Sequence, residues 1–337
     1  MQTLVTGASG FLGSHIADRL IERGDAVRAL VRPTSDSSYL KSRDAELVVG
    51  DITEPESLPA ALSGVEVVYH AAAHVSDWGP WSDFKRVTVD GTRNMLRAAA
   101  NAGVKRFLHV SSDAVYRYDD LAKGVDESTR LETYFGPLDY YRRAKTAAEK
   151  VARRAQERGR VPVTIVRPAL ILGERDSAML PGLIAFLKSS TAAYMGNGRN
   201  QLPCIYAGDV ADLCIRAATT EAALGETYNA VNEEHVTQRD FFNAAAEIAG
   251  VDAPRRTIPL RVLYTIAAGM EAVARLRGWS HHPDLTRFSV NLMGLDYKED
   301  NSKARAELGW RAEVGMREAV GRSVEWARER KRASVSG

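Results

Sequence analysis

Short apolar runs alternate with longer amphipathic runs along the first half of the chain. The apolar runs are rich in β-branched residues, as buried strands are, and they lie at 3–6, 26–31, 47–49, 65–70, 106–111 and 163–166. Amphipathic stretches between them, for example 55–62 and 87–102, have the spacing of helices. Strands that alternate with helices favour a parallel sheet, because each crossover must return over one face of the sheet. The pattern therefore predicts an α/β fold with a doubly wound parallel sheet.

The pattern changes after about residue 173. Gly, Pro and aromatic residues are scattered through 173–202, and short helices and single strands follow to the end. We expect 1–172 to form the doubly wound unit, with a strand and a helix added from about 203–232. Residues 173–202 and 233–330 then form a small α/β cap that binds the substrate, and 331–337 form a frayed tail.

Composition excludes several classes of protein. The formal net charge of +2 gives no reason to expect a nucleic acid as partner. Two cysteines, Cys204 and Cys214, are too few for a disulfide framework, and no ligand cluster suggests a metal, so we expect reduced core thiols. The chain starts directly with a strand-like segment, and no uncharged run reaches the ~18 residues of a membrane span. We therefore expect a cytoplasmic protein.

The segment Thr6–Gly13, TGASGFLG, directly follows the first strand and opens the first helix. Glycines there let the backbone turn sharply and approach a pyrophosphate, which rests on the positive end of the helix. Such a turn can be merely structural, but here both the strand and the helix flank it. The segment predicts a Rossmann-type dinucleotide-binding unit. The residues expected to contact the cofactor are Gly7, Ser9, Gly10, Phe11, Leu12 and Gly13.

The end of the second strand distinguishes the two nicotinamide cofactors. An acidic residue there binds the ribose of NAD, whereas an arginine accommodates the extra phosphate of NADP. This chain has Arg32 and no carboxylate, which favours NADP(H), although a solvated surface arginine would leave NAD(H) as the cofactor. Candidates to assist Arg32 are Arg28, Ser35 and Lys41. Asp51 and Ile52, which end the third strand, are predicted to meet the adenine, although a loop aspartate often only caps a helix.

Tyr141 and Lys145 stand four residues apart on a predicted helix, so the phenol and the ammonium point the same way. A nearby ammonium favours the phenolate and lowers the pKa of the tyrosine toward neutrality, which suits general acid–base work. Ser111 and Ser112 end a strand 29 residues before Tyr141, where a serine hydroxyl can bind the substrate oxygen. Tyr140 is out of phase with Lys145, and we interpret it as a packing residue.

Together these residues resemble the extended short-chain dehydrogenase/reductase family, within the NAD-dependent epimerase/dehydratase superfamily, over nearly the whole chain. The matching segments are 6–13, 51–52, 70–72, 91–94, 111–112, 141–145, 167–168, 206–210 and 303–310. The resemblance implies a Rossmann-type doubly wound parallel sheet with a small C-terminal α/β cap. It also implies a homodimer through helices near 87–102 and 141–155.

The resemblance implies a role for each matching residue. Tyr141 is the acid–base group, Lys145 holds the ribose and lowers the pKa of the tyrosine, and Ser112 orients the substrate, with Ser111 as the alternative. The further cofactor contacts are Ala71 beside the ribose, Ala72, Ala73, and Pro168 near the nicotinamide. Thr88 departs from the family pattern, because many members have asparagine there, but the departure concerns a supporting helix contact.

Two positions argue against a nucleotide-sugar substrate. Family members that bind a nucleotide sugar have an arginine at the position of Leu202 and an asparagine at the position of Leu170. Segments 74–81, 196–200 and 283–288 instead resemble the 3β-hydroxysteroid dehydrogenase-like and 2-alkyl-3-oxoalkanoate reductase-like branch. An apolar, steroid-like or 3-oxo/3-hydroxy acyl substrate is implied. The residues expected to contact it are His74, Trp78, Trp81, Ser112 and Leu170. Packing explains the two tryptophans equally well.

The segment 258–276 is unusually apolar. A buried cap helix is the favoured interpretation, and a lipid-facing surface that implies peripheral membrane contact is the other.

The sequence thus predicts an NAD(P)-dependent dehydrogenase or reductase that interconverts a secondary alcohol and a ketone. One alternative is a nucleotide-sugar epimerase or dehydratase with tightly bound NAD. Another is a non-catalytic, cofactor-binding scaffold, which would have no need of Ser112, Tyr141 and Lys145 together.

Overall fold

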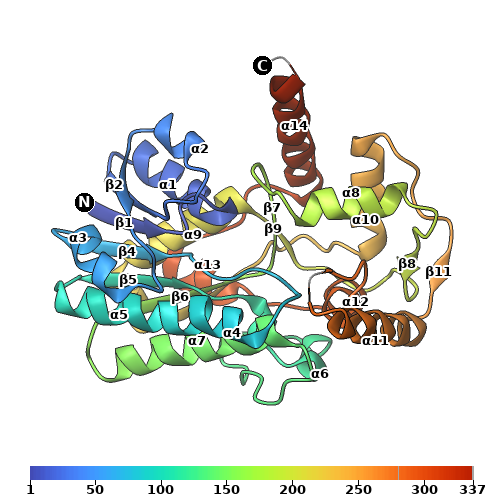
Figure 1. Ribbon diagram of the computed structural model, residues 1–337, viewed down its shortest axis with the longest axis horizontal. Helices are drawn as coiled ribbons and strands as arrows, with labels where there is room; N and C mark the ends of the chain where they lie inside the picture. The colour runs from blue at the N-terminus through green and yellow to red at the C-terminus, as the bar shows by residue number, and fades with distance from the viewer. Residues whose placement is uncertain (280, 336–337) are drawn as a thin grey trace.

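A seven-stranded sheet forms the centre of the computed structural model, which describes residues 1–279 and 281–335 (Figure 1). The strand order is β10-β6-β5-β4-β1-β2-β3, and all neighbouring strands pair in parallel. Because the chain starts in the middle and winds outward in both directions, this is the doubly wound sheet that the sequence predicted. Its strands are β1 (Gln2–Thr6), β2 (Ala26–Val31), β3 (Ala45–Val49), β4 (Val67–His70), β5 (Arg106–Val110), β6 (Val163–Pro168) and β10 (Thr227–Ala230).

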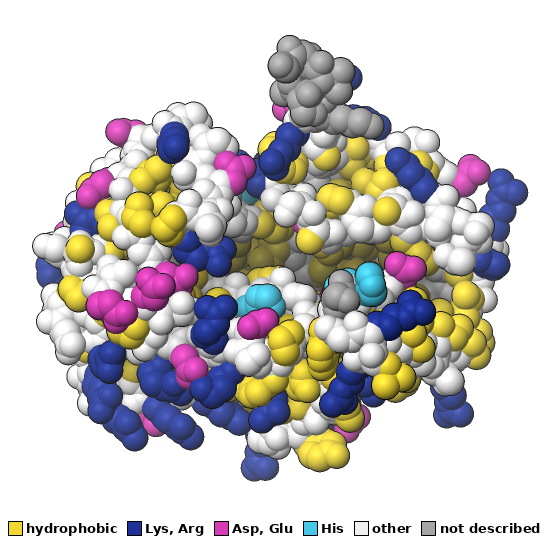
Figure 2. Space-filling model, in the orientation of Figure 1, with side chains coloured by type: hydrophobic (Ala, Val, Ile, Leu, Met, Phe, Trp, Pro, Cys, Tyr) yellow, Lys and Arg dark blue, Asp and Glu magenta, His cyan; other side chains and the backbone are white. Residues whose placement is uncertain are grey.

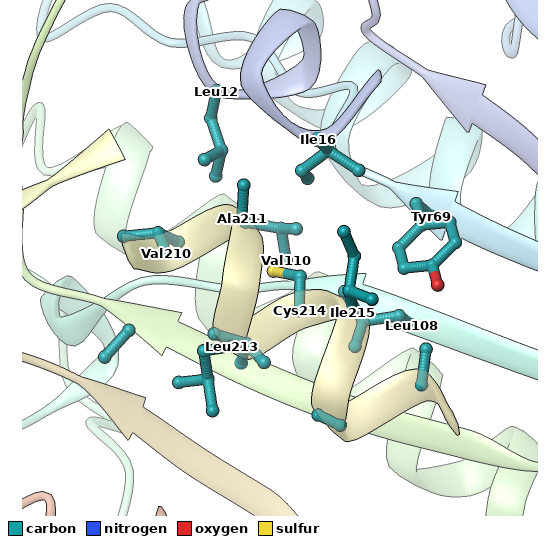
Figure 3. Packing of buried hydrophobic residues seen from close by; sticks show 14 of the residues in the cluster. Leu12, Ile16, Tyr69, Leu108, Val110, Val210, Ala211, Leu213, Cys214 and Ile215 are labelled. Carbon is teal, nitrogen blue, oxygen red and sulfur yellow. The ribbon is translucent and has the colours of Figure 1, made fainter. Parts of the chain in front are cut away.

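Helices cover both faces of the sheet, because crossovers of a parallel sheet must bury its two apolar faces. On one face lie α1 (Phe11–Glu22) and α9 (Ala207–Thr219), and on the other α3 (Leu58–Leu62), α5 (Gly91–Asn101) and α7 (Tyr140–Glu157). Figure 3 shows side chains of α1 and α9 that pack together with side chains of β4 and β5. The labelled residues are Leu12 and Ile16 of α1, Tyr69 of β4, Leu108 and Val110 of β5, and Val210, Ala211, Leu213, Cys214 and Ile215 of α9.

A smaller group of elements lies beside the carboxyl ends of the strands, at the right of Figure 1. It contains α8 (Met179–Lys188), α10 (Gln238–Ala249), α11 (Leu260–Leu276), α12 (Arg287–Gly294) and α14 (Met316–Val335). Two short parallel pairs complete it, β7 (Leu170–Leu172) with β9 (Cys204–Tyr206), and β8 (Tyr194–Met195) with β11 (Thr257–Ile258). The remaining short elements are α2 (Ser38–Lys41), η1 (Pro55–Ser57), α4 (Trp81–Phe84), η2 (Lys85–Asp90), η3 (Asp113–Val115), α6 (Tyr118–Leu121), η4 (Glu221–Ala223) and α13 (Ser302–Leu308).

The helix predicted at 87–102 is divided in the structure. A π-helical segment, η2, precedes the regular helix α5, which begins at Gly91. A Cβ at Gly91 would lie 2.7 Å from Cδ1 of Ile52, so a larger residue there would require the Ile52 side chain to shift. Apolar periodicity does not distinguish a short π-helical segment from an α-helix, so the sequence did not reveal this wider turn.

The predicted frayed tail is wrong for 331–335, because α14 continues to Val335. Lysine, arginine and alanine, which occupy positions 331–333, are good helix formers. Arg328 also donates to the backbone oxygen of Ile248, at 2.8 Å, which fastens the last turns to α10. Residues 336–337 lie outside the described part of the chain.

Cys204 and Cys214 lie buried and unpaired, as expected, and burial raises the pKa of both thiols. Within 1–279 and 281–335, no group of three or more His, Cys, Asp or Glu side chains is arranged to hold a metal ion. None of the helices in the described part of the chain has the length and apolar character needed to cross a bilayer.

Candidate active site

The glycine motif between β1 and α1 has the geometry of a cofactor cradle. Gly7 has a positive φ of +72°, and a Cβ there would lie 2.9 Å from the backbone nitrogen of Ala72. A Cβ at Gly13 would collide with the carbonyl oxygen of Gly7. No side chain caps α1 at Gly10, so the first-turn amides remain available to an anion. The glycines thus permit the close turn between β1 and α1, and the uncapped amides at the start of α1 fit the pyrophosphate of a dinucleotide.

The ends of neighbouring strands border this cradle. The backbone nitrogens of Ala71 and Ala72 donate to the carbonyl and hydroxyl oxygens of Thr6, at 3.2 and 3.3 Å. Ala73 continues this half-buried segment after β4. Ile52 is buried, while Asp51 is half-buried and accepts from the backbone nitrogen of Thr53 at 2.8 Å. Asp51 thus does cap a turn, through one of its two carboxylate oxygens.

Arg32 is exposed directly after β2. The turn that follows is closed by Ser35, whose backbone nitrogen donates to the carbonyl oxygen of Arg32 at 3.0 Å. The suggested help from Arg28 is wrong, because its guanidinium is bound elsewhere. It donates to Glu46 at 3.0 Å and to the backbone oxygens of Ala61 and Ser63, both at 2.9 Å.

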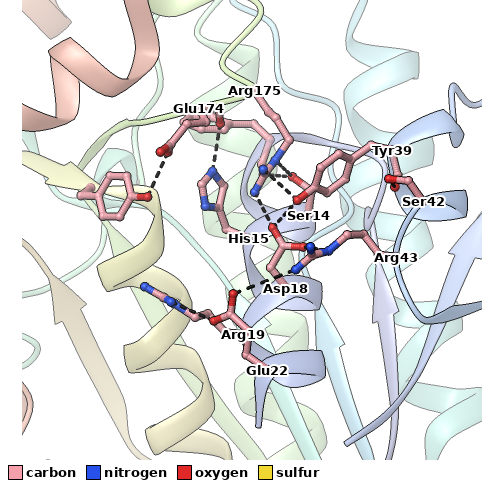
Figure 4. A network of polar contacts seen from close by, with 12 residues as sticks. Ser14, His15, Asp18, Arg19, Glu22, Tyr39, Ser42, Arg43, Glu174 and Arg175 are labelled. Carbon is pink, nitrogen blue, oxygen red and sulfur yellow. Dashed lines mark hydrogen bonds and ion pairs between the residues drawn. The ribbon is translucent and has the colours of Figure 1, made fainter. Parts of the chain in front are cut away.

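A polar network next to the cradle was not predicted (Figure 4). Arg175 follows β7 with a positive φ of 70°, and it lies against α1 and α2. Its guanidinium donates to the side-chain oxygens of Ser14 (2.7 Å), Tyr39 (3.0 Å) and Asp18 (2.8 Å). The first loop of the cap is thereby fastened to the helix that carries the glycine motif.

Tyr141 and Lys145 lie on α7, and Ser112 follows β5 directly. Tyr141 is half-buried, and its phenol interacts with the hydroxyl of Ser112. Lys145 is buried and donates from Nζ to the backbone oxygen of Val110 at 3.1 Å. The structure thus gathers the three predicted catalytic side chains at the carboxyl end of β5.

The two adjacent serines have different partners. Ser111 donates to Glu149 Oε2 at 2.6 Å, inside the protein. Ser112 donates to Asp113 Oδ1 at 3.0 Å and accepts from the backbone nitrogen of Ala114 at 3.2 Å. Of the two, only Ser112 also interacts with Tyr141.

The expected low pKa of Tyr141 is wrong for the chain on its own. Burial raises the pKa of this phenol to about 12, although the hydroxyl of Ser112 opposes the shift. Burial lowers the pKa of Lys145 to about 8, against the opposing charge of Glu149. The ammonium of Lys145 is directed at the oxygen of Val110 and is not among the groups that shift Tyr141. At neutral pH, Tyr141 therefore holds a proton that it can donate.

A buried ion pair lies behind Lys145. Glu149, one turn further along α7, and Arg167 on β6 are both 0% exposed, and Oε1 and Nη2 are 2.6 Å apart. Burial alone would raise the pKa of Glu149, but Arg167 and the other donors lower it to about 2. Arg167 also donates to the phenol oxygen of Tyr116 at 2.8 Å. These contacts hold α7 against β6 at the level of the catalytic side chains. Pro168, which follows Arg167, is the buried end of β6.

Most of the predicted substrate residues lie in one aromatic group. Trp78 donates from Nε1 to the backbone oxygen of Trp279 at 3.1 Å, and the two rings are 4.9 Å apart. Trp81 packs on Tyr140, with ring centroids 5.8 Å apart. Both tryptophans are therefore packing anchors, whatever else they contact. Tyr140 is a packing residue, as predicted.

The catalytic tyrosine also has an aromatic neighbour from the cap. Phe288 on α12 meets Tyr141 edge to face, with centroids 5.5 Å apart. His74 makes a similar contact with Phe84 at 4.6 Å. Leu170 does not join this group, because it lies on β7 with the cap core. Phe288 lies in the segment 283–288 that resembles the 3β-hydroxysteroid dehydrogenase-like branch, although it was not named as a site residue. Trp279 lies in none of the segments that the sequence singled out.

Asp77 fastens the loop after β4 to the cap. Its Oδ1 lies 2.5 Å from Nε2 of His282, and its Oδ2 accepts from the hydroxyl of Thr286 at 2.6 Å. Together with the hydrogen bond from Trp78, these contacts join the loop after β4 to Trp279, His282 and Thr286.

Similarity to known proteins agrees with this geometry. Residues 3–230 match the family described as "NAD dependent epimerase/dehydratase family". A 4-hydroxy-2-methyl-3-oxo-4-farnesyl-3,4-dihydroquinoline-1-oxide ketoreductase of Stigmatella aurantiaca is 31% identical over 93% of both chains. Sterol demethylase protein B of Methylococcus capsulatus is 32% identical and covers 98% of this chain and 99% of its own.

One solved structure is similar over almost the same length. The crystal structure of gox2253 superposes with a TM-score of 0.81 at 33% identity, covering 98% of this chain and 99% of its own. The family match spans more than half of the chain, and the ketoreductase spans nearly all of it. The chain therefore belongs to the NAD-dependent epimerase/dehydratase family, among the extended short-chain dehydrogenases/reductases, and is an NAD(P)-dependent oxidoreductase.

Proposed function

We propose that the protein interconverts a secondary alcohol and a ketone on an apolar substrate, with Ser112, Tyr141 and Lys145 as its catalytic residues. The observation that carries the proposal is the meeting of these three side chains at the end of β5. When bound, the nicotinamide supplies or accepts the hydride. The protein's own task is then to hold the oxygen of the substrate and to move one proton.

Each catalytic residue has a distinct part in that task. Tyr141, whose phenol is protonated at neutral pH, donates its proton to the carbonyl oxygen during reduction and takes it back during oxidation. Ser112 steadies the same oxygen through its hydroxyl. Lys145 binds the ribose of the cofactor, and its positive charge would favour loss of the phenol proton once the ammonium turns from the backbone oxygen of Val110 toward Tyr141.

The cradle residues would hold the cofactor. Gly7, Gly10 and Gly13 permit the close turn that would bring the first amides of α1 to the pyrophosphate, and Ser9, Phe11 and Leu12 complete the turn into α1. Asp51 and Ile52 would border the adenine, Ala71 to Ala73 the ribose, and Pro168 the nicotinamide. Arg32, exposed at the end of β2, supports a preference for NADP(H), with NAD(H) as the alternative.

An apolar substrate fits the walls of the site. Trp78, Trp81, Phe288 and His74 line the side from which the cap meets Tyr141. The predicted contact with Leu170 has less support, because Leu170 packs with the cap core. We propose that 173–202 and 233–330 form the substrate-binding unit. The names of the two relatives, a ketoreductase of a farnesylated quinoline and a sterol demethylase protein, support this substrate class. The homodimer through α5 and α7 stays a prediction, which sedimentation velocity would test.

The deciding experiment follows the absorbance of reduced nicotinamide. Purified protein is mixed with NADP⁺ or NAD⁺ and a panel of 3β-hydroxysteroids and 3-hydroxy fatty acids. We expect net reduction, faster with NADP⁺. Tyr141→Phe should lower turnover by about 100-fold or more, since it removes the proton donor, and leave the dissociation constant of the cofactor within about twofold. Retained turnover in this variant would refute the assignment.

If no substrate of the panel changes the absorbance of the nicotinamide, the second candidate is favoured, a nucleotide-sugar epimerase or dehydratase. Nucleotide sugars would then be tested for conversion without net redox. Failure of these substrates as well, with cofactor still bound, would favour the non-catalytic scaffold.

A further inference from the structure

Helix α11 has two faces of opposite exposure. Leu263, Ala267, Glu271 and Ala274 are buried against the cap. On the other side Val262, Ile266 and Val273 are 47–48% exposed, and Leu276 is 88% exposed. The interpretation of this segment as a buried cap helix is therefore correct for one face and wrong for the other.

The exposed apolar residues form one stripe. Residues 262, 266, 269, 273 and 276 follow one another at intervals of four, three, four and three, which places them on one side of an α-helix. The stripe is about 21 Å long at 1.5 Å per residue. Val262, Ile266, Val273 and Leu276 account for four of the nine large apolar side chains that are exposed in the described part of the chain. Such clustering on one helix marks an interaction surface rather than scattered exposure.

The charge around the stripe is positive. Arg261 and Arg275 border it along one edge, and Arg277 lies at its C-terminal end. The one carboxylate of α11, Glu271, is buried and paired with Arg287 at 2.6 Å. In Figure 2, hydrophobic and Lys or Arg side chains gather together over α11, at the lower right.

We propose that this face of α11 docks on the surface of an anionic lipid bilayer. Apolar side chains flanked by arginines are the features of a helix that lies in the membrane interface, with its apolar side among the acyl chains and its cations at the headgroups. A second copy of the chain fits less well. A two-fold antiparallel contact would bring Arg261 of one copy toward Arg275 of the other, and α11 offers no exposed carboxylate to compensate.

The docked face lies close to the proposed route of the substrate. A pocket of about 340 Å³ opens between α11 and α12, and its lining includes Leu260, Tyr264 and Val290. Helix α12 also carries Phe288, the neighbour of Tyr141. Resting on the function proposed above, this geometry points to the delivery of an apolar substrate from the bilayer, whereas the docking itself depends on no reaction.

Vesicle flotation tests the docking directly. The full chain is mixed with vesicles of phosphatidylcholine alone or of phosphatidylcholine with phosphatidylserine, at low and at high salt. We expect flotation with the anionic vesicles and at least about tenfold less without phosphatidylserine or at high salt. Equal flotation with both kinds of vesicle, or none at low salt, would overturn the proposal.

Substitutions on the exposed face of α11 test whether this face is the one that binds the vesicles. The triple variant Val262→Ser, Ile266→Ser, Val273→Ser should lose at least about tenfold in vesicle binding, as should Arg261→Glu with Arg275→Glu. Tyr134→Ser removes an apolar side chain that is 85% exposed elsewhere and should bind as the wild type does. Circular dichroism checks that each variant folds. Unchanged binding of the triple variant would contradict the proposal.

Two further measurements separate the alternatives. If sedimentation without lipid shows that the triple variant lowers the mass of the assembly, the face is an interface between copies and the proposal is wrong. Turnover of a short, water-soluble alcohol without vesicles reports on the reaction alone, so its loss would count against the proposed function and not against docking.

Discussion

At the end of β5, two adjacent serines have opposite roles because successive side chains of a strand point to opposite sides. Ser111 binds the buried carboxylate of Glu149, and Ser112 faces Tyr141. The sequence alone left both serines open, and only the resemblance favoured Ser112. The position of a strand end could be predicted from its apolar run, but the direction of each side chain there depends on the last residue of the strand, which the pattern placed one residue too late.

Matched substitutions distinguish the catalytic role of Ser112 from the structural role of Ser111. Ser112→Ala should lower turnover about 100-fold, because it removes a hydroxyl that steadies the reacting oxygen. Ser111→Ala should change turnover less than about threefold but lower the free energy of unfolding by about 2 kcal/mol, since Glu149 loses a partner inside the protein. Steady-state kinetics and urea unfolding measure both effects. The reverse pattern would move the catalytic role to Ser111.

Lys145 makes stability depend on pH in a defined direction. Burial lowers the pKa of its ammonium to about 8 in the folded chain, from 10.5. Below pH 8 the ammonium is charged in both states, and the cost of its burial is fully present. Between pH 8 and 10.5 the unfolded chain binds more protons than the folded one, so stability rises with pH.

The change is measured against Lys145→Met, in which this titration is absent. The free energy of unfolding of the wild type, minus that of the variant, should be constant below pH 8. It should then increase by up to about 3 kcal/mol toward pH 10.5. Urea unfolding at several pH values gives the difference, and a flat difference across this range would contradict a lowered pKa.

At the scale of elements, local signals were predictable and distant contacts were not. The glycine motif was found because its reason is local: the turn, the helix start and the close approach involve neighbouring residues. Arg175 and Ser14 are 161 positions apart, and Trp78 and Trp279 are 201 apart. No apolar periodicity connects such pairs, because they meet only when the cap folds against the sheet. For the same reason α11 was recognised as apolar, but not as half-exposed.

The packing between β1 and α1 gives a prediction for Gly13. In Gly13→Ala the new methyl group would collide with the carbonyl oxygen of Gly7, so the turn must open. We expect at least about tenfold weaker cofactor binding. We also expect a lower melting temperature, because overpacking destabilises the folded state. The control is Gly321→Ala on α14, where a Cβ has open space and helix propensity improves. Fluorescence titration measures the cofactor affinity, and equal affinity of the Gly13 variant and the control would contradict the cradle.

At the scale of the molecule, two of the contacts between the cap and the sheet unit lie beside the candidate site. Arg175 joins the first cap loop to α1, beside the cofactor cradle. Asp77 joins the loop after β4 to His282 and Thr286, beside the aromatic group. One fastening is thus near the site of the cofactor and the other near that of the substrate. Loosening each should affect a different ligand.

Asp77→Ala tests the second fastening. Without the carboxylate, the contacts to His282 and Thr286 are lost, and the hydrogen bond from Trp78 to the backbone oxygen of Trp279 remains to join the loop after β4 to this part of the cap. Binding must then order a looser set of side chains around the substrate, which costs more conformational entropy. KM should therefore rise about tenfold, while the dissociation constant of the cofactor stays within about twofold of the wild-type value. Asp119→Ala, at a carboxylate 83% exposed elsewhere, is the control. A cofactor affinity that falls together with KM would mean that the two fastenings act as one, and that the cap closes over both ligands as a single body.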